Sequence, residues 1–485
     1  MNNIAYNIAL PLLAAFVLPI INNSSKSAAR LLGPFVLLAM VAFAGSNLYA
    51  VSHPVSIELG GFRPPLGINF YLDQLALLFA LIIPLLMLVL WPWTTSQGIR
   101  EEALLLLLAA AASGLALSGD LFNIYVFYEL LSVASFGLVA ANRSGAAFAA
   151  SFRYLVISGL GTVLALVGIA LIYTRTGTLN LAHIGQYASQ LNDPIGLSAF
   201  ALIVLGIGVK AEVFPLNSWV PEVYSSAPVR TVALLAGLVS KLAVLVLIRL
   251  LVVAYDGTSA YAVLAVLGML GIVWGEFSAW RSQDMKRLLA YSSIGQLGLV
   301  LVAFSIPGPA GMIAGVAVML HHMIIKPGLF LLSEHWPVAI DKLGELGRSR
   351  IIFGLYLFFA LSLVGVPPLP GFWAKLMVVT GLADNASPLH LTALLVLLSA
   401  TVVEAAYLMR VALRMGTDVG NPGSPATQSS ARLPALALVF ALLLAGSLLL
   451  LNPIASGLEK ISGQSSDRAL YMQTVLPDMG PGYAL

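Results

Sequence analysis

The sequence contains no cysteine, and only 9% of its 485 residues are charged. Without cysteine, the chain cannot form disulfides, hold an iron–sulfur cluster through thiolates or use a cysteine nucleophile. A soluble domain carries about 25% charged residues, so the low charge content argues against a surface that faces water. The sequence also lacks a Rossmann glycine motif, a P-loop, clustered metal ligands and a basic run for nucleic acid. We therefore expect no cofactor, no metal, no nucleic-acid partner and no bond chemistry in this chain.

Apolar residues make up 59% of the chain and fall in long runs. A helix needs about 20 such residues to cross the hydrocarbon core of a bilayer, and we count 14 candidate spans. Their approximate limits are 4–21, 31–51, 71–91, 101–118, 120–141, 152–174, 195–216, 229–252, 259–279, 286–304, 309–333, 351–383, 390–412 and 433–452. Strands that cross an outer membrane would be about 9–11 residues long with alternating polarity, whereas these runs are longer and apolar on all sides. The predicted fold class is therefore an all-α polytopic membrane protein.

Most lysines and arginines fall in the odd-numbered loops between these spans. Loops rich in Lys and Arg stay in the cytoplasm. We therefore expect a multi-pass protein of the cell (inner) membrane with both termini on the outer side. Residues 4–21 lack a preceding basic segment and a cleavage site, which favours a first span over a signal peptide.

Seven charged residues lie well inside the predicted spans: Glu129, Lys210, Lys241, Arg249, Lys326, Lys375 and Glu404. A charge at mid-membrane costs at least about 2.5–3.5 kcal/mol on insertion scales, so such residues usually face a bundle interior or water and pair with one another. Arg249 is close to an outer span end, where snorkelling to the surface is the favoured interpretation. Glu212 and Glu276 are close to cytoplasmic span ends, where we expect water nearby.

The remaining buried charges are candidates for a proton path. Burial disfavours the charged form of a lysine, and a nearby carboxylate favours it again. A buried lysine beside a carboxylate can therefore load and release a proton near neutral pH, and Glu129 is the natural carboxylate for Lys210. Glu404 has a second interpretation, as a structural partner of Tyr407 or Arg410.

Residues 321–327 read HHMIIKP. His322 and Lys326 are four residues apart and share a helix face, and histidine titrates near neutral pH. We interpret the two as a proton relay. A zinc site and simple packing are the alternatives, but no third metal ligand is close in sequence. Pro327 frees a backbone carbonyl one turn back, which loosens the helix beside Lys326.

Two spans contain helix-breaking prolines. Span 7 is interrupted by Pro215, shortly after Lys210. Span 12 is interrupted just before Lys375 by Pro367, Pro368 and Pro370. Irregular backbone at membrane depth is tolerated where it is buried or lines a water-filled cavity. Paired interrupted spans in two halves of a chain indicate a transport path.

The spacing of the charges indicates an internal repeat. Lys210 and Lys375 are 165 residues apart, and Lys241 and Glu404 are 163 apart. Spans 4–8 and 9–13 would then be equivalent five-helix units, and the second would be inverted because five is odd. The predicted regions are 1–100 with spans 1–3, 101–255 and 256–415 with the two repeats, and 416–485 with a linker, span 14 and an external tail.

Several motifs resemble those of the antiporter-like subunits of respiratory complex I, Mrp-type cation/proton antiporters and membrane-bound hydrogenases. They are FYELL (127–131), KAEVFPLNSWVPE (210–222), DMKRLLAYSSIGQ (284–296), HHMIIKP (321–327) and PPLPGFWAK (367–375). The resemblance covers the chain from Asp73 to span 13. Members often have histidines where this chain has Asn217 and Tyr224, and Glu212 is less usual in them.

The resemblance implies 14 spans, two inverted five-helix units and a hydrated polar axis at mid-membrane. It implies Glu129 and Lys210 as a coupled pair, Lys241 as a bridge, Lys326 as the central relay and Lys375 as the terminal exchanger. The expected function is proton translocation within a multi-subunit complex, either as the D-type component of an Mrp-type Na⁺/H⁺ antiporter or as the pumping arm of a complex I-type or hydrogenase-type redox enzyme. The expected partners are other hydrophobic subunits, lipid, protons and, as a second ion, Na⁺. The alternative is a stand-alone secondary transporter of a cation or small solute.

Overall fold

The computed structural model describes residues 2–93, 98–255, 257–336, 339–346, 350–416 and 432–477. Apart from one two-stranded sheet, the regular structure in these residues is helical. The chain divides into two compact units. The first comprises Met1–Ala211, Leu242–Ala260 and Lys460–Leu485, and the second comprises Glu212–Lys241 and Tyr261–Glu459. Most of the predicted linker before span 14, residues 417–431, lies outside the described residues.

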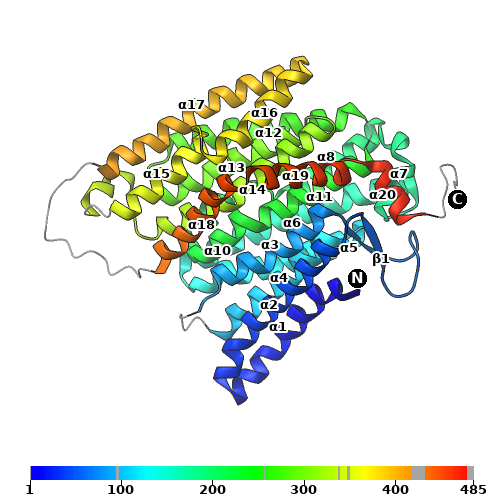
Figure 1. Ribbon diagram of the computed structural model, residues 1–485, viewed down its shortest axis with the longest axis horizontal. Helices are drawn as coiled ribbons and strands as arrows, with labels where there is room; N and C mark the ends of the chain where they lie inside the picture. The colour runs from blue at the N-terminus through cyan, green and yellow to red at the C-terminus, as the bar shows by residue number, and fades with distance from the viewer. Residues whose placement is uncertain are drawn as a thin grey trace. The chain divides into compact units, whose positions relative to one another are not determined.

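The first unit contains the N-terminal helices, most of α11 and the C-terminal helix α20 (Figure 1). The bounds are η1 (Asn2–Ala5), α1 (Tyr6–Ser24), α2 (Lys26–Ala50), α3 (Gln74–Leu90), α4 (Ile99–Leu117), α5 (Leu121–Val139), η2 (Ala140–Asn142), α6 (Gly145–Thr176), α7 (Leu181–Gln186), η3 (Ala188–Leu191), α8 (Pro194–Gly208), α11 (Ser240–Ala254) and α20 (Arg468–Val475). Strands β1 (Val55–Glu58) and β2 (Asn69–Leu72) pair antiparallel, with Val55 opposite Leu72. Side-chain oxygens cap the start of a helix by accepting hydrogen bonds from its first backbone N–H groups. Asp73 does this at α3 and Asp120 at α5.

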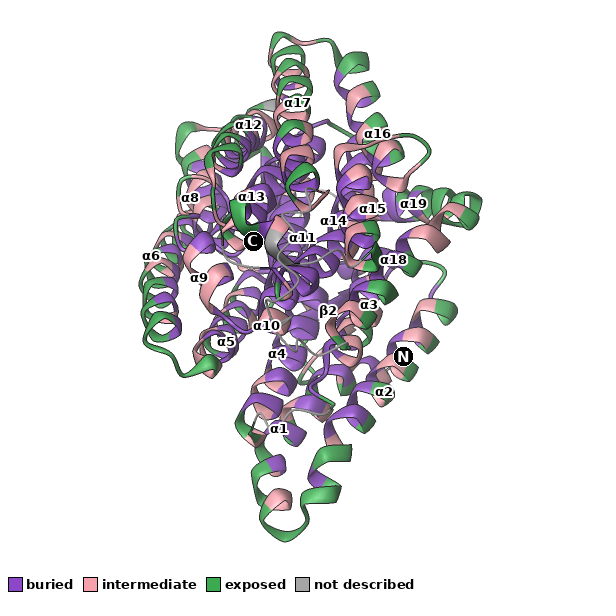
Figure 2. Ribbon diagram, turned by 90° about the vertical axis from the view of Figure 1, so that its left-hand side faces the viewer, coloured by how far each residue is buried: buried purple, intermediate pink, exposed green. Residues whose placement is uncertain are grey.

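The second unit is built around α14. The bounds of its elements are α9 (Val220–Ser226), α10 (Val229–Leu234), the π-helical turn η4 (Leu235–Val239), α12 (Thr258–Arg281), α13 (Met285–Phe304), α14 (Pro309–Ser333), η5 (Ile340–Leu346), α15 (Arg350–Val364), α16 (Pro370–Asn385), α17 (Pro388–Gly416) and α18 (Arg432–Leu449). The helix α19 (Leu451–Ser465) runs from this unit into the first along the chain. Helix α14 packs against α10, α13, α16 and α18. Helices α13 and α14 are buried along most of their length, whereas α17 is exposed on one side (Figure 2).

Ten helices in the described residues are long and apolar enough to cross a membrane, and α3, α8 and α15 are shorter apolar helices. Large apolar side chains are exposed on the outer faces, such as Phe152 and Leu160 of α6 and Leu398 and Val402 of α17. Exposed apolar faces on consecutive long helices suit lipid better than water. The multi-pass, nearly all-helical fold is thus confirmed, whereas the count of 14 spans and the inverted repeats stay predictions.

The first predicted helix break lies between α8 and α9. Helix α8 ends at Gly208 and α9 begins at Val220, so Pro215 lies in the irregular segment that joins them. Glu212 in this segment has a left-handed backbone with φ of 58°, a conformation that L-residues adopt rarely. The backbone therefore departs from right-handed helical geometry within two residues of Lys210.

The second break lies between α15 and α16. Helix α15 ends at Val364 and α16 begins at Pro370. Proline is tolerated at the start of a helix because the first N–H groups have no partner in the helix. Pro367 and Pro368 therefore lie in the break itself, and Pro370 starts the helix that carries Lys375.

Candidate functional site

Lys210 follows the end of α8 and is buried, with 1% of its surface exposed. Its ammonium donates a hydrogen bond to Ser158 Oγ of α6 at 3.2 Å and lies 3.6 Å from the centre of the Tyr128 ring of α5. The Tyr128 hydroxyl donates to Gly206 O at 3.0 Å, a carbonyl in the last turn of α8 that also accepts the Val209 N–H at 3.4 Å. The face of an aromatic ring attracts a cation, so this ammonium is held by neutral groups alone.

Glu129, the predicted partner of Lys210, makes no ion pair with it in the described residues. Its Oε1 accepts a hydrogen bond from Thr162 of α6 at 2.5 Å. Ser158 and Thr162 are one turn apart on α6, a rise of about 6 Å. Helix α6 thus presents one hydroxyl to the lysine and the next to the acid. A proton that moves between Glu129 and Lys210 has to cross this gap through water or through side-chain movement.

Lys241 lies at the start of α11, directly after the π-helical turn η4, and is fully buried. Its ammonium donates to Ala236 O within that turn and to Ser240 Oγ at 3.1 Å. Such turns are frequent at functional sites because they displace carbonyls from the regular helical ladder. Gly237 places the turn against α14, since a Cβ there would lie 2.6 Å from the Pro327 ring.

Lys326 of α14 is also fully buried. Its ammonium donates to Ser292 Oγ of α13 at 2.8 Å and to a backbone carbonyl of the same helix. Neither ring nitrogen of His322 has a hydrogen-bond partner in the part of the chain that the structure describes. The neighbouring His321 instead bonds Ser362 Oγ at 3.1 Å. Among the described residues, no group of three or more His, Cys, Asp or Glu side chains could hold a metal ion.

Lys375 and Glu404 form a direct ion pair between α16 and α17, with 2.5 Å between Nζ and Oε2. Lys375 also donates to Val364 O at 3.2 Å, the last carbonyl of α15 before the break. Gln296 of α13 donates to the other carboxylate oxygen of Glu404 at 2.6 Å. Charge-assisted hydrogen bonds of this kind are short and strong, so four helices (α13, α15, α16 and α17) together hold the pair in place.

Two buried acids lie outside the set that the sequence singled out. Glu276 is only 3% exposed, although its place in the span suggests nearby water, and its Oε2 accepts a hydrogen bond from Tyr407 at 2.9 Å. Glu212 is also buried and accepts from the Tyr224 hydroxyl at 2.7 Å. Position within an apolar run does not distinguish a wet helix end from a packed one. Gly275, which precedes Glu276, is a sequence signal that this helix end is packed against a neighbour, because glycine permits two helices to approach closely.

Arg249 does not snorkel to the surface as its position suggests. It is buried in the first unit, where its guanidinium donates to Ala116 O and Ser118 O, both at 3.0 Å. A second guanidinium nitrogen lies 3.6 Å from Asp73 Oδ1. Because a guanidinium carries five donors in a planar fork, it can satisfy several acceptors at once inside the protein.

The fold and these charges define a polytopic membrane protein with lysines and carboxylates buried among its helices. A family described as NADH:quinone oxidoreductase/Mrp antiporter, TM, matches residues 118–403, more than half of the chain. The chain belongs to this family.

Relatives and a solved structure match most of the chain. The N-type component of the NADH-quinone oxidoreductase of Desulforudis audaxviator is 30% identical, over 83% of this chain and 85% of that protein. The D-type component of the Na⁺/H⁺ antiporter of Alkalihalophilus pseudofirmus is 28% identical, over 78% of this chain and 80% of that protein. A chain in the structure of the membrane-bound sulfane sulfur reductase, an archaeal respiratory membrane complex, superposes with a TM-score of 0.89 and 31% identity, over 98% of this chain and 100% of that one.

Proposed function

We propose that this chain is a proton-translocating subunit of a multi-subunit membrane complex. The proposal rests on the surroundings of three buried ammonium groups, those of Lys210, Lys241 and Lys326. In the described residues, the ammonium groups of all three are buried and contact only hydroxyls, carbonyls or an aromatic ring. An unpaired buried charge is strongly unfavourable, whereas a lysine in such a site readily binds and releases a proton.

The proton path consists of two groups of residues. In the first unit it comprises Glu129 and Lys210, with the hydroxyls of α6 between them. In the second unit it comprises Lys241, His322, Lys326, Lys375 and Glu404. The relatives named above include subunits of a redox enzyme and of a cation/proton antiporter. The driving event is therefore either a redox reaction in partner subunits or exchange with a cation such as Na⁺.

The proposal extends to the architecture. Each half of the chain contains a helix break with a lysine within it or shortly after it, Lys210 and Lys375, which supports 14 spans with spans 4–8 and 9–13 as inverted repeats. Other hydrophobic subunits are the partners, because the relatives are named as subunits of larger assemblies. The distribution of Lys and Arg supports the cell membrane as the location, with both termini on the outer side.

Substitution of Lys210 tests the proposal. The native complex would carry Lys210→Ala or Lys210→Arg, and a pH-sensitive dye would report proton movement in inverted vesicles after addition of Na⁺ or of reductant. Alanine removes the proton-binding amine, so transport should be abolished. Arginine keeps the charge but cannot be deprotonated in proteins, so it should be equally inactive.

The matched control is Lys286→Ala. Lys286 is on α13 and pairs with Glu334 at 3.0 Å, and both side chains are partly exposed. Such a surface pair contributes about 0–1 kcal/mol, so this variant should transport normally. Normal transport by Lys210→Ala in an assembled complex would contradict the proposed function.

A further inference from the structure

Glu276 is a buried acid that the path described above does not use. It lies on α12, and its Oε2 accepts a hydrogen bond from Tyr407 at 2.9 Å. No ion pair reaches it in the described residues. Its other oxygen packs against α13 at Gly295, where a Cβ would lie 2.2 Å from Oε1. The absence of a side chain at Gly295 therefore makes room for this carboxylate.

The carboxylates of Glu276 and Glu404 lie against adjacent residues of α13. Gly295 borders the first, and Gln296 donates a hydrogen bond to the second at 2.6 Å. Tyr407 follows Glu404 by three residues on α17 and so lies on the same helix face, about 4.5 Å further along. The ionisable groups that face Glu276 are Glu404 and Tyr407 of α17, Lys375 of α16 and Lys326 of α14.

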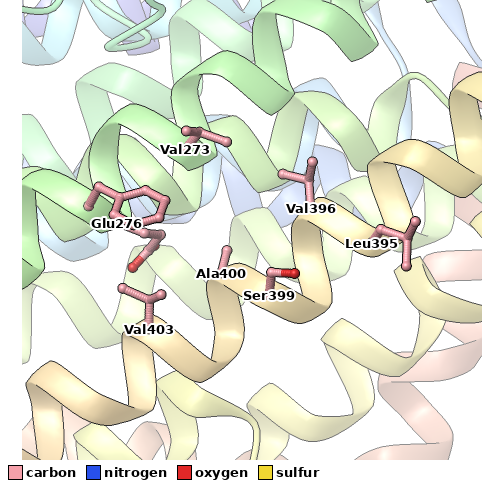
Figure 3. Close-up of a pocket in the computed structure, with 8 residues that line it drawn as sticks. Val273, Glu276, Leu395, Val396, Ser399, Ala400 and Val403 are labelled. Atoms are coloured by element: carbon pink, nitrogen blue, oxygen red, sulfur yellow. The ribbon is translucent and has the colours of Figure 1, made fainter.

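Glu276 also lines a groove between α12 and α17 (Figure 3). The groove has a volume of about 220 Å³, and its walls are apolar apart from Glu276 and Ser399. The Glu276 side chain points toward α17 in Figure 3. A water molecule takes up about 30 Å³ of liquid volume, so the groove has room for several beside the carboxylate. Glu404 does not line this groove.

We propose that Glu276 is the residue through which the Lys375–Glu404 end of the path exchanges protons with water in this groove. The inference rests on the proposed function. The Lys375 ammonium releases one proton and becomes an amine, and the Glu276 carboxylate takes up one proton and becomes a carboxylic acid. Glu276 then releases the proton to groove water, which becomes hydronium. No electron moves, and the total charge is unchanged at each step.

The test compares Glu276→Gln with Glu276→Asp in the native complex, with the same vesicle assay. Glutamine keeps the size of the side chain and an oxygen that accepts from Tyr407, but it cannot carry a proton. Transport should therefore fall by about tenfold or more. Aspartate keeps the carboxylate and should retain most of the rate. A purely structural role would rank the variants in the opposite order, because glutamine fills the space that aspartate leaves empty.

The matched control is Glu102→Gln, a buried acid near the start of α4 that lies outside the path; this variant should transport at the wild-type rate. Normal transport by Glu276→Gln, with Lys210→Ala inactive, would overturn the role of Glu276 and leave the proposed function intact. Equal inactivity of the Gln and Asp variants in assembled complexes would also overturn it, because packing would then explain the loss. Transport by Lys210→Ala would instead show that the proposed function itself had failed.

Discussion

Lys210 lies within a helix break and Lys375 lies in the helix that follows one, and their charges are satisfied in different ways. At the first break, the Tyr128 hydroxyl donates to a carbonyl in the last turn of α8, and the Lys210 ammonium contacts the Tyr128 ring and a hydroxyl of α6. At the second break, Lys375 itself takes the last carbonyl of α15 and also binds Glu404 directly. One lysine is thus separated from its acid, and the other is joined to it.

This difference sets what must change before each lysine releases its proton. A lysine in contact with a carboxylate holds its proton until that contact is weakened, because the pair stabilises both charges. A lysine on neutral groups, with its acid one helical turn away, is poised to change its protonation when the acid or its water moves. The same residue types at equivalent breaks are therefore expected to respond differently to substitution.

The largest expected effect is on stability, from Glu404→Gln compared with Glu129→Gln. Removing one partner of a buried ion pair costs about 3–5 kcal/mol. The Lys375 side chain is 12% exposed, which favours the lower end, about 3 kcal/mol. Glu129→Gln keeps an oxygen that accepts from Thr162 and loses only the charge on that acceptor, so it should cost about 1 kcal/mol. Thermal unfolding of the purified complexes measures both, and equal losses would contradict the difference between the two breaks.

An intermediate effect, on transport, is expected from Ser158→Ala and Thr162→Val. Each removes a hydroxyl from α6 between Glu129 and Lys210. We expect transport to fall by about tenfold with a loss of about 1 kcal/mol in stability. The matched control is Ser135→Ala, because Ser135 Oγ bonds only a carbonyl of its own helix in the described residues. Wild-type transport by both α6 variants would show that these hydroxyls are not part of the route.

The smallest effect is expected from Tyr128→Phe. The variant loses the hydrogen bond to Gly206 O, about 1 kcal/mol, but keeps the ring under Lys210. Tyr128→Leu removes the ring as well, and the further loss should match a cation–π interaction of about 0.5–2 kcal/mol. The two variants would be compared by thermal unfolding and by transport. If Tyr128→Phe were as inactive as Lys210→Ala, the hydroxyl rather than the ring would support the lysine.

Local features of the sequence were sufficient to predict the class of fold and to select the charged residues from which the candidate site is built. Long apolar runs predict membrane helices because the cost of exposing a backbone to lipid leaves few alternatives. Charges inside such runs stand out since each is costly there, and prolines near Lys210 and Lys375 predict breaks because proline cannot continue a helix. These inferences need only a residue and its neighbours in the chain.

The partners of each charge were decided by tertiary structure. The sequence paired Lys210 with Glu129, and in the described residues each of the two bonds a different hydroxyl of α6, Ser158 for the lysine and Thr162 for the acid. It placed Glu276 at a water-exposed helix end, whereas the residue is 3% exposed, contacts Gly295 and Tyr407, and meets the groove between α12 and α17 at its edge.

The sequence by itself determined which segments form apolar helices and where two of them break, because those depend on composition and local backbone geometry. Only the tertiary structure decided which groups touch. A hydrogen bond forms over about 3 Å, and that distance is set by the packing of helices that are far apart in the chain.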